Sequence, residues 1–336
     1  MRVVASIPQS TNGGEYLFVE PPLVFVGRWG SGIRVFDFSI PAVPRFICEM
    51  QEEYAAAAAS AHGSVICSVG RMYGEVHADT GLNVIDISEA AAPKIIGIAS
   101  LDGLTPRTVC LTRDFAYAVV LAGESTQNDG MRFTARLYVF DICDKRHPRR
   151  RSTLDIDGDP FSVSSDGNYV YLVARLTTMH LDAIATSREL LRIIDVRNPD
   201  AVKEVSSIEM DAWNSDVTID GRSIYTTSRD RLRVFDVSRG AKPRLSAEVR
   251  LGLQCGSLVA LRNRVYVDRA TKSDGSRICV VDTSRPQHPR LLGEGVIQPG
   301  KCPLGPESAA ISDEFLVHLG ENELRCVQVL SQSGER

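Results

Sequence analysis

Side chains that can do acid–base chemistry are concentrated in two polar segments of the chain. Residues 70–80 carry Tyr73 and His77 among arginine and carboxylate side chains, and residues 174–189 carry His180. A histidine near carboxylates can act as a general base or as a metal ligand. Neither histidine has an HxH, HxxxH or HExxH partner, and both also suit an ordinary solvated loop. We therefore take His77 and His180 as the candidate acid or base of a catalytic site, and Tyr73 as a candidate ligand-binding residue.

A second group of side chains could contact a ligand. Its members each lie just ahead of a short apolar segment or at its start: Arg107, Asp157, Asp159, Trp213, Asn214 and Glu307. In an enzyme, Arg107 and Asp159 would position the substrate and Trp213 would stack on it. Because carboxylates and an aromatic ring dominate this group, it suits a cationic or amine-containing ligand, or a basic peptide segment. Charge scattered for solubility would give the same composition.

The run 155–159 (DIDGD) has carboxylates on alternate residues, as calcium-binding loops do. It lacks the glutamate at the twelfth position of an EF-hand, and Pro160 leads at once into a strand-like segment. The chain also contains no GxSxG elbow, P-loop or strand–GxGxxG–helix unit. The sequence therefore predicts neither a metal ion nor a cofactor.

The candidate residues are distributed over a repeat that occurs six times. Each copy is a short apolar strand that ends in aspartate, and in five copies a proline follows seven residues later. The aspartates lie 41 to 55 residues apart, a period typical of propellers and other repeat arrays. The aspartates are Asp37, Asp86, Asp141, Asp195, Asp236 and Asp282. We expect them to be structural, each accepting hydrogen bonds from backbone amides of the turn that follows.

Each repeat contains four short β-prone segments separated by turn signals. The fifth repeat is the clearest, and its segments predict one four-stranded antiparallel blade: 214–222, 223–229, 231–237 and 244–250. In every blade a basic residue follows the proline position, at the start of the outermost strand. Such a residue discourages edge-to-edge pairing of exposed strands.

A seventh, degenerate copy ends the chain. Gln328 occupies its aspartate position, and too few residues follow for an outermost strand. Residues 1–5 match the pattern of an outermost strand, so we expect them to complete the last blade and close the ring. We predict that residues 1–336 form one all-β domain, a single seven-bladed β-propeller with blades centred on the six aspartates and Gln328.

The repeat resembles that of the LVIVD-repeat family of bacterial β-propellers, over essentially the whole chain. Two departures are small, since Val202 replaces one proline and Gln328 replaces the last aspartate. The members of this family share no defined activity. The resemblance therefore implies the fold and carries over no catalytic residue.

Composition excludes several classes of function. A net charge of −4 argues against broad nucleic-acid binding, which needs a basic surface. No apolar run approaches the ~20 residues that span a bilayer, and the N-terminus does not read as a signal peptide. None of the eight cysteines forms a CxxC pair, which fits reduced thiols in a cytoplasmic protein.

The connections between the second and third segments of each repeat differ in length. They are short in the first and fifth repeats and long in three neighbouring ones: 70–80, 122–135 and 174–189. Long loops that a fold does not need are often functional, although added loop length is also well tolerated. We predict a propeller that binds a small ligand or a protein segment at the mouth carrying these loops. The alternative is an enzyme of the lyase, isomerase or cyclase type, with its site assembled from several blades at the same mouth.

Overall fold

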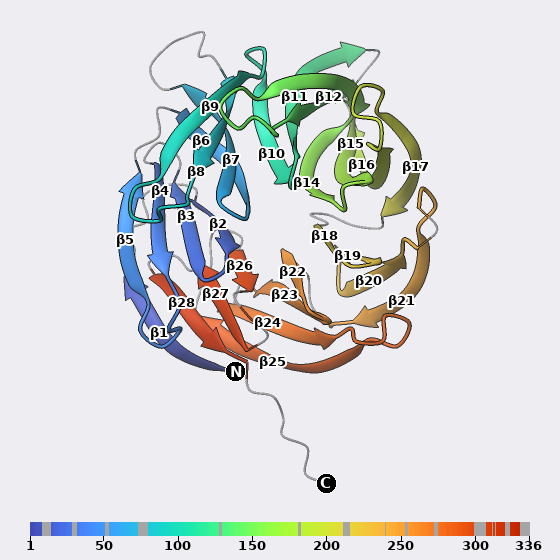
Figure 1. Ribbon diagram of the computed structural model, residues 1–336. Coiled ribbons are helices and arrows are strands. Elements are labelled where there is room, and N and C mark those ends of the chain that lie inside the picture. The colour runs from blue at the N-terminus through green and yellow to red at the C-terminus, as the bar shows by residue number, and fades with distance from the viewer. Residues whose placement is uncertain are drawn as a thin grey trace.

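The computed structural model is a ring of seven antiparallel sheets, each of four strands, around a central axis (Figure 1). It describes residues 1–8, 15–28, 32–50, 54–72, 80–127, 130–180, 183–210, 216–238, 240–252, 255–271, 275–298, 307–310, 312, 314–319 and 323–329. Every regular element among these residues is a strand. The predicted all-β, seven-bladed propeller is confirmed.

The strands of each blade follow one another from the axis to the rim, and the blades are numbered along the chain. Blades 1 and 2 are β2 (Glu15–Glu20), β3 (Leu23–Arg28), β4 (Gly32–Asp37) and β5 (Arg45–Met50), then β6 (Tyr54–His62), β7 (Val65–Met72), β8 (Thr80–Asp86) and β9 (Lys94–Ser100). Blades 3 and 4 are β10 (Thr105–Leu111), β11 (Phe115–Gln127), β12 (Gly130–Asp141) and β13 (Arg149–Asp157), then β14 (Asp159–Ser165), β15 (Tyr169–His180), β16 (Ala183–Asp195) and β17 (Lys203–Met210). Blades 5 and 6 are β18 (Val217–Asp220), β19 (Ser223–Ser228), β20 (Arg231–Asp236) and β21 (Arg244–Arg250), then β22 (Leu258–Leu261), β23 (Arg264–Thr271), β24 (Gly275–Asp282) and β25 (Arg290–Gln298).

Blade 7 joins the two ends of the chain. Its inner strands are β26 (Glu307–Ala310), β27 (Phe315–Leu319) and β28 (Glu323–Gln328), and its outermost strand is β1 (Arg2–Pro8). β1 pairs antiparallel with β28, from Arg2 opposite Gln328 to Pro8 opposite Glu323. Figure 1 shows β1 on the outside of β28, between blades 1 and 6. The predicted closure by the N-terminal strand is confirmed, and the strand runs three residues further than the sequence indicated.

The motif aspartates make the same turn in each of the six blades that carry them. The backbone N–H two residues further on donates to Oδ1 of the aspartate at 2.8 to 3.1 Å, and the donors are Ser39, Ser88, Cys143, Arg197, Ser238 and Ser284. At Asp37, bonds from the hydroxyl and N–H of Ser39 and from Arg45 lower the pKa to about 2. The predicted structural role of these aspartates is confirmed.

A β-bulge precedes each motif aspartate and could not be read from the sequence. In these six blades, the register between the third and fourth strands shifts at the two residues just before the aspartate, as at Val35 and Phe36. A bulge increases the local twist of the strand that carries it. It therefore lets each outermost strand, which begins at a basic residue such as Arg45, wrap around the rim.

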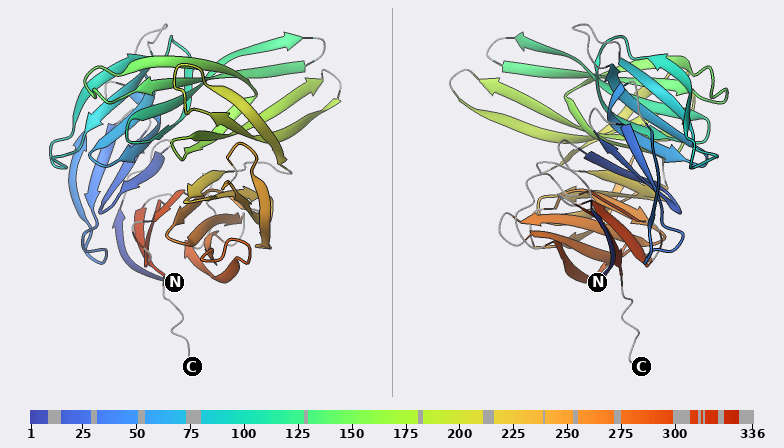
Figure 2. Two further views of the ribbon diagram at one scale, coloured as in Figure 1. Left: turned by 45° about the vertical axis from the view of Figure 1, so that its right-hand side comes forward. Right: turned by 90° about the vertical axis from the view of Figure 1, so that its left-hand side faces the viewer.

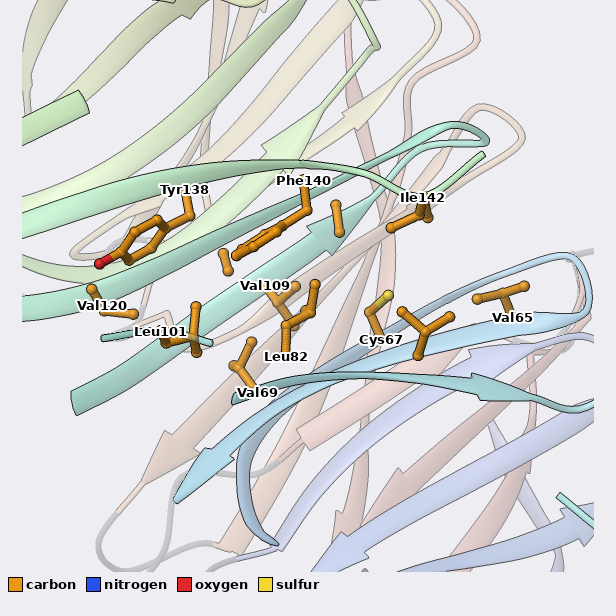
Figure 3. Close-up of a cluster of buried hydrophobic side chains, with 13 residues drawn as sticks. Val65, Cys67, Val69, Leu82, Leu101, Val109, Val120, Tyr138, Phe140 and Ile142 are labelled. Carbon is orange, nitrogen blue, oxygen red and sulfur yellow. The ribbon is translucent and has the colours of Figure 1, made fainter. Parts of the chain in front are cut away.

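The core of the protein lies between neighbouring blades rather than within any one of them. Between blades 2 and 3, Val65, Cys67 and Leu82 pack against Val109 and Phe140 (Figure 3). Burial raises the pKa of the Cys67 thiol, so this side chain behaves as a small apolar group. Each blade is thus stabilised by its neighbours, which explains why a closed ring is needed.

Two hairpins extend beyond the blades from which they arise (Figure 2). β10 pairs with β11 only as far as Leu121, and β13 pairs with β12 only as far as Thr134, so residues 122–127 and 130–133 form a two-stranded ribbon. In blade 4, residues 176–180 and 183–188 form a second ribbon beyond Arg175 and Glu189. The sequence predicted long loops at these two places, and this was wrong because the segments pair as strands. In the third predicted loop, residues 73–79 lie outside the described part of the chain.

Candidate functional site

The two ribbons and the starting points of the innermost strands lie on one face of the ring, named here the mouth face. In a four-stranded antiparallel blade, the connection between strands two and three lies on the same side as the link to the next blade. β10 begins at Thr105 and β14 at Asp159, at the foot of the ribbons. Figure 2 shows both ribbons projecting from this face in the same direction.

Arg107 and Asp159, two residues predicted from the sequence, lie together on this face. They belong to the innermost strands of blades 3 and 4. A nitrogen of the Arg107 guanidinium lies 3.1 Å from Asp159 Oδ1, and 37% and 21% of the two side chains are exposed. Within the described part of the chain, this oxygen accepts no well-directed hydrogen bond. The contact is therefore an ion pair that leaves acceptor capacity on Asp159.

An arginine and a glutamate that sequence analysis missed support the base of the β15–β16 ribbon. Arg175 and Glu189 face each other across the hairpin, and an arginine nitrogen lies 2.9 Å from Glu189 Oε1. Only 1% of the Glu189 side chain is exposed. The Arg175 guanidinium also lies 4.3 Å from the ring centroid of Phe161, as in a cation–π contact. No spacing rule marks these residues, because they meet only when the strands pair.

A single glycine links blade 3 to blade 4 beside this pair. Asp157 ends β13, Asp159 begins β14, and Gly158 between them has a φ of 110°. A Cβ at Gly158 would lie 2.8 Å from the carbonyl oxygen of Arg175, so no larger residue fits without movement. The Gly158 N–H donates to the carbonyl of Phe133, 2.8 Å away on the β11–β12 ribbon. This link therefore ties the two ribbons to each other at their base.

Two further carboxylates near the mouth, those of Asp102 and Asp155, are each paired with an arginine. Asp155 Oδ1 lies 2.6 Å from Arg136, and Asp102 Oδ2 lies 2.5 Å from Arg150. Burial raises the pKa of Asp102, but hydrogen bonds from Tyr138 and Arg150 outweigh it and leave a lowered pKa. Asp102 is therefore charged at neutral pH. Both Asp102 and Asp155 already have arginine partners. Each ion pair also links two separate segments of the chain, so these carboxylates have a structural role.

Another carboxylate near the mouth holds three blades together. Asp216 lies just ahead of β18, and it accepts hydrogen bonds from the Ser162 hydroxyl in blade 4 and the Leu258 N–H in blade 6. The N–H of Val217 donates to the same carboxylate at 2.8 Å. Burial raises the pKa of Asp216, and these hydrogen bonds oppose the shift without cancelling it. Asp216 is thus a structural residue of the inner wall.

Several predicted site residues cannot be placed by their side chains. Tyr73, His77, Trp213 and Asn214 lie outside the described residues. For two others only the backbone is described: His180 ends β15 opposite Ala183, and Glu307 begins β26. Their roles in binding or catalysis stay predictions.

The described residues offer no cluster of three or more histidine, cysteine, aspartate or glutamate side chains that could hold a metal ion. In the DIDGD run, Asp155 and Asp159 instead point to two different arginines, Arg136 and Arg107. Nor does the described part of the chain contain a helix long and apolar enough to cross a membrane.

Comparison with known proteins agrees with this architecture. A model of the LVIVD repeat matches residues 76–100, which include the motif strand β8 and the outermost strand β9 of blade 2. The match and the seven-bladed ring both fit the LVIVD-repeat family of β-propellers that the sequence resembles. A search of curated protein sequences finds no match.

Solved structures with low sequence identity share the fold. The β-propeller domain of Cps50 (Swd1) from Myceliophteria thermophila has a TM-score of 0.62 and 10% identity, covering 98% of this chain and 99% of that chain. The computationally designed Ika8 protein has a TM-score of 0.60 and 11% identity, covering 98% and 100%. A hypothetical selenium-binding protein from Sulfolobus tokodaii has a TM-score of 0.59 and 14% identity, covering 92% and 78%. At these identities the likeness shows the fold alone.

Proposed function

We propose that this protein is a non-catalytic β-propeller that binds a protein segment at its mouth face, between and along the two ribbons. The observation that carries the proposal is the extension of two neighbouring hairpins, residues 122–127 with 130–133 and residues 176–180 with 183–188, beyond the ring. A small ligand at the foot of the ribbons is the narrower form of the same proposal. Its contacts would come from Arg107, Asp157 and Asp159.

The ring itself does not need these ribbons. In blade 1 the corresponding hairpin ends at the pair Arg28 and Gly32, and in blade 5 it ends at Ser228 and Arg231. Both blades still form complete four-stranded sheets. An isolated two-stranded ribbon contributes little to stability, so a role outside folding explains its presence better.

The feet of the ribbons are held in a fixed arrangement. The Arg175–Glu189 pair lies across one hairpin, and Gly158 connects that blade to Phe133 of the other. Arg192 adds a further tie, since it donates to the Asp157 carbonyl at 2.7 Å and pairs with Glu204 at 2.7 Å. Preorganised surfaces bind more tightly because less conformational entropy is lost on binding.

The ribbons suit a polypeptide better than a compact small molecule. A two-stranded ribbon has two edges along which backbone N–H and C=O groups can pair with an added strand. The Asp157 carboxylate at their foot is exposed, which favours a segment with basic residues near that end. The net charge of −4 gives no support to broad nucleic-acid binding. A cytoplasmic location is part of this proposal, because the seven described cysteines are free.

The enzyme alternative has less geometric support. In the register of blade 4, Asp159 lies opposite Arg175, and His180 follows five residues further along β15. At roughly 3.3 Å per residue, about 16 Å of strand separates the two positions. Acid–base catalysis requires groups within hydrogen-bond reach of one substrate, so binding is the better-supported function.

Site-specific photo-crosslinking in cells tests the proposal. A benzoyl-phenylalanine at Thr177 on the β15–β16 ribbon is expected to crosslink to a discrete protein, and digestion should locate the attached segment. The same crosslinker at Ser238, in a turn on the opposite face, is the matched control. Equal capture from both positions, or capture from neither, would contradict binding at the ribbons.

A further inference from the structure

A pocket on the face opposite the ribbons lies between blades 2 and 3. It has a volume of about 630 Å³, within the range of small-molecule sites. Three turns form it: residues 62–65 after β6, residues 111–114 after β10, and residues 142–145 after β12, from which Ile142, Cys143 and Lys145 line the pocket. The ribbon-bearing mouth lies at the other ends of the same strands, so this pocket is separate from the proposed binding face.

Positive charge predominates on the walls of this pocket. Arg113 and Lys145 contribute two fixed positive charges from two different turns, and His62 adds a ring N–H donor from the third. Asp114 is the single carboxylate among the lining residues. Within the described part of the chain, neither Arg113 nor Lys145 belongs to an ion pair, although the charge of Lys145 adds to the effect of the Ser88 hydrogen bonds that lower the pKa of Asp86.

The lack of an ion pair among the described residues distinguishes Lys145 from Arg150 and Arg151 in the basic run 144–151. Arg150 is paired with Asp102, and Arg151 is paired with both Asp141 and Asp200. These arginines therefore have structural partners along strand β13. Lys145 instead lines the pocket, which the general basic character of the run does not explain.

The floor of the pocket is apolar and packed against the core. Val65 and Ile142 are buried members of the core cluster between blades 2 and 3, and Leu111 packs against that cluster. Figure 3 shows Val65 and Ile142 near one end of this cluster. A ligand could therefore place an apolar part on the floor and an anionic group among the cations of the wall.

Cys143 stands at the rim of the pocket as an exposed free thiol. A hydrogen bond to Asp141 is the main cause that raises the pKa of this thiol, and burial adds to the shift. Cys143 is thus held in its protonated form and is a poor nucleophile. The alkylation rate of Cys143 can nevertheless report binding, because a ligand in the pocket would cover the thiol.

We propose that this pocket binds a small molecule that carries a phosphate group and an apolar part, with Arg113, Lys145 and His62 around the phosphate. Arginine and lysine on separate turns suit an anion with several oxygens, and charge-assisted bonds of this kind are the strong ones. The proposal goes beyond the binding of a protein segment and concerns a second site on the other face.

Calorimetric titration of the full chain with three probes tests the chemistry. Phenyl phosphate supplies both the anion and the apolar part, inorganic phosphate supplies the anion alone, and phenol the apolar part alone. The expected order of affinity is phenyl phosphate, then phosphate, with no binding of phenol. Absence of heat from phenyl phosphate at millimolar concentration, or equal binding of phenol, would overturn the proposal.

Two variants and a matched control locate the site. Arg113→Ala and Lys145→Gln should each weaken phenyl phosphate binding about tenfold or more, as expected for loss of a charge-assisted bond. Arg222→Ala removes the same charge from an exposed turn of the same face in blade 5, and it should leave the affinity within twofold. Equal weakening by Arg113→Ala and Arg222→Ala would show nonspecific attraction and contradict a built site.

Alkylation of Cys143 gives an independent readout. Bound phenyl phosphate should slow the reaction of iodoacetamide with Cys143 at least fivefold, while the half-buried Cys48 reacts at an unchanged rate. Binding without protection of Cys143 would place the ligand elsewhere and overturn the assignment. A single-stranded oligonucleotide that binds at the pocket more tightly than phenyl phosphate would contradict the small-molecule assignment.

Discussion

The turns after the motif aspartates and the ribbons of blades 3 and 4 are built in opposite ways. The turns are nearly the same in six blades, each with one backbone N–H donating to an aspartate oxygen. The ribbons occur in two neighbouring blades, and blades 1 and 5 end their hairpins without them. What repeats stabilises the ring, and what differs is available for binding.

The largest loss of stability in the ring is expected from removing residues 1–8. This deletion leaves β28 with an open edge and exposes the apolar side chains that pack against Val4 and Ile7. We expect the free energy of unfolding to fall by about 4 kcal/mol or more, with aggregation through the open edge. Urea denaturation followed by tryptophan fluorescence measures the loss, and a synthetic peptide of residues 1–8 should restore part of it. Unchanged stability would contradict closure by β1.

The next largest effect should come from Arg175→Ala, at the boundary between ring and ribbon. The substitution leaves the buried carboxylate of Glu189 without its guanidinium partner, which should cost about 3 kcal/mol. Arg188→Ala is the matched control, because its pair with Glu209 is exposed at 3.9 Å and should contribute less than about 0.5 kcal/mol.

Hydrogen exchange measures whether the loss of stability in Arg175→Ala is confined to the β15–β16 ribbon. In Arg175→Ala, amides of residues 176–188 should exchange faster than those of blades 1 and 5. Equal acceleration around the whole ring would contradict the view of the ribbon as an addition to an independent ring.

Gly97 and Gly293 occupy the same position of the repeat. Comparing alanine substitutions at the two positions therefore isolates the contribution of packing between blades. Val84 and Val280 each lie two residues before a motif aspartate. Val84 pairs with Gly97, and Val280 pairs with Gly293. A Cβ at Gly97 would lie 2.2 Å from the carbonyl oxygen of Lys145 in the next blade, whereas at Gly293 it would meet nothing within 4 Å. Gly97→Ala should therefore cost about 1–3 kcal/mol and Gly293→Ala about zero in urea denaturation. Similar costs would refute the close contact between blades 2 and 3.

A smaller, pH-dependent effect should come from the motif aspartates. The pKa of Asp37 is lowered from 3.8 to about 2, so its contribution is present above pH 4 and is lost as pH falls toward 2. Asp37→Asn should flatten the stability profile over that range by about 1 kcal/mol, since solvent screens these interactions. Urea midpoints between pH 2 and pH 6 measure the slope. The same slope in the variant would show that Asp37 does not contribute.

The sequence predicted the ring well because the repeat is local. An aspartate, a proline seven residues later and a basic residue after it mark one turn and one outermost strand. The match of residues 1–5 to that pattern was enough to predict closure with β28. The bulges before each aspartate left no signal, because they depend on register between strands rather than on residue type.

The site was predicted less completely. Arg107 and Asp159 lie together because each stands near the start of an innermost strand and those strands surround one axis, whereas their role in binding stays a prediction. Arg175 and Glu189 were missed because they are fourteen residues apart and meet only through pairing of β15 with β16. The ribbons were read as loops because threonine- and serine-rich segments look like turns until their cross-strand partners are known.

The most direct test of this account is to shorten both ribbons and measure binding and stability on the same protein. Residues 125–132 and residues 176–188 are each replaced by Asn-Gly, which closes a hairpin with a two-residue turn. We predict that the segment captured by crosslinking at Thr177 binds at least a hundredfold more weakly in calorimetry, while the free energy of unfolding changes by less than about 1 kcal/mol. Unchanged affinity, or collapse of the ring, would contradict the division between a repeated scaffold and an added binding surface.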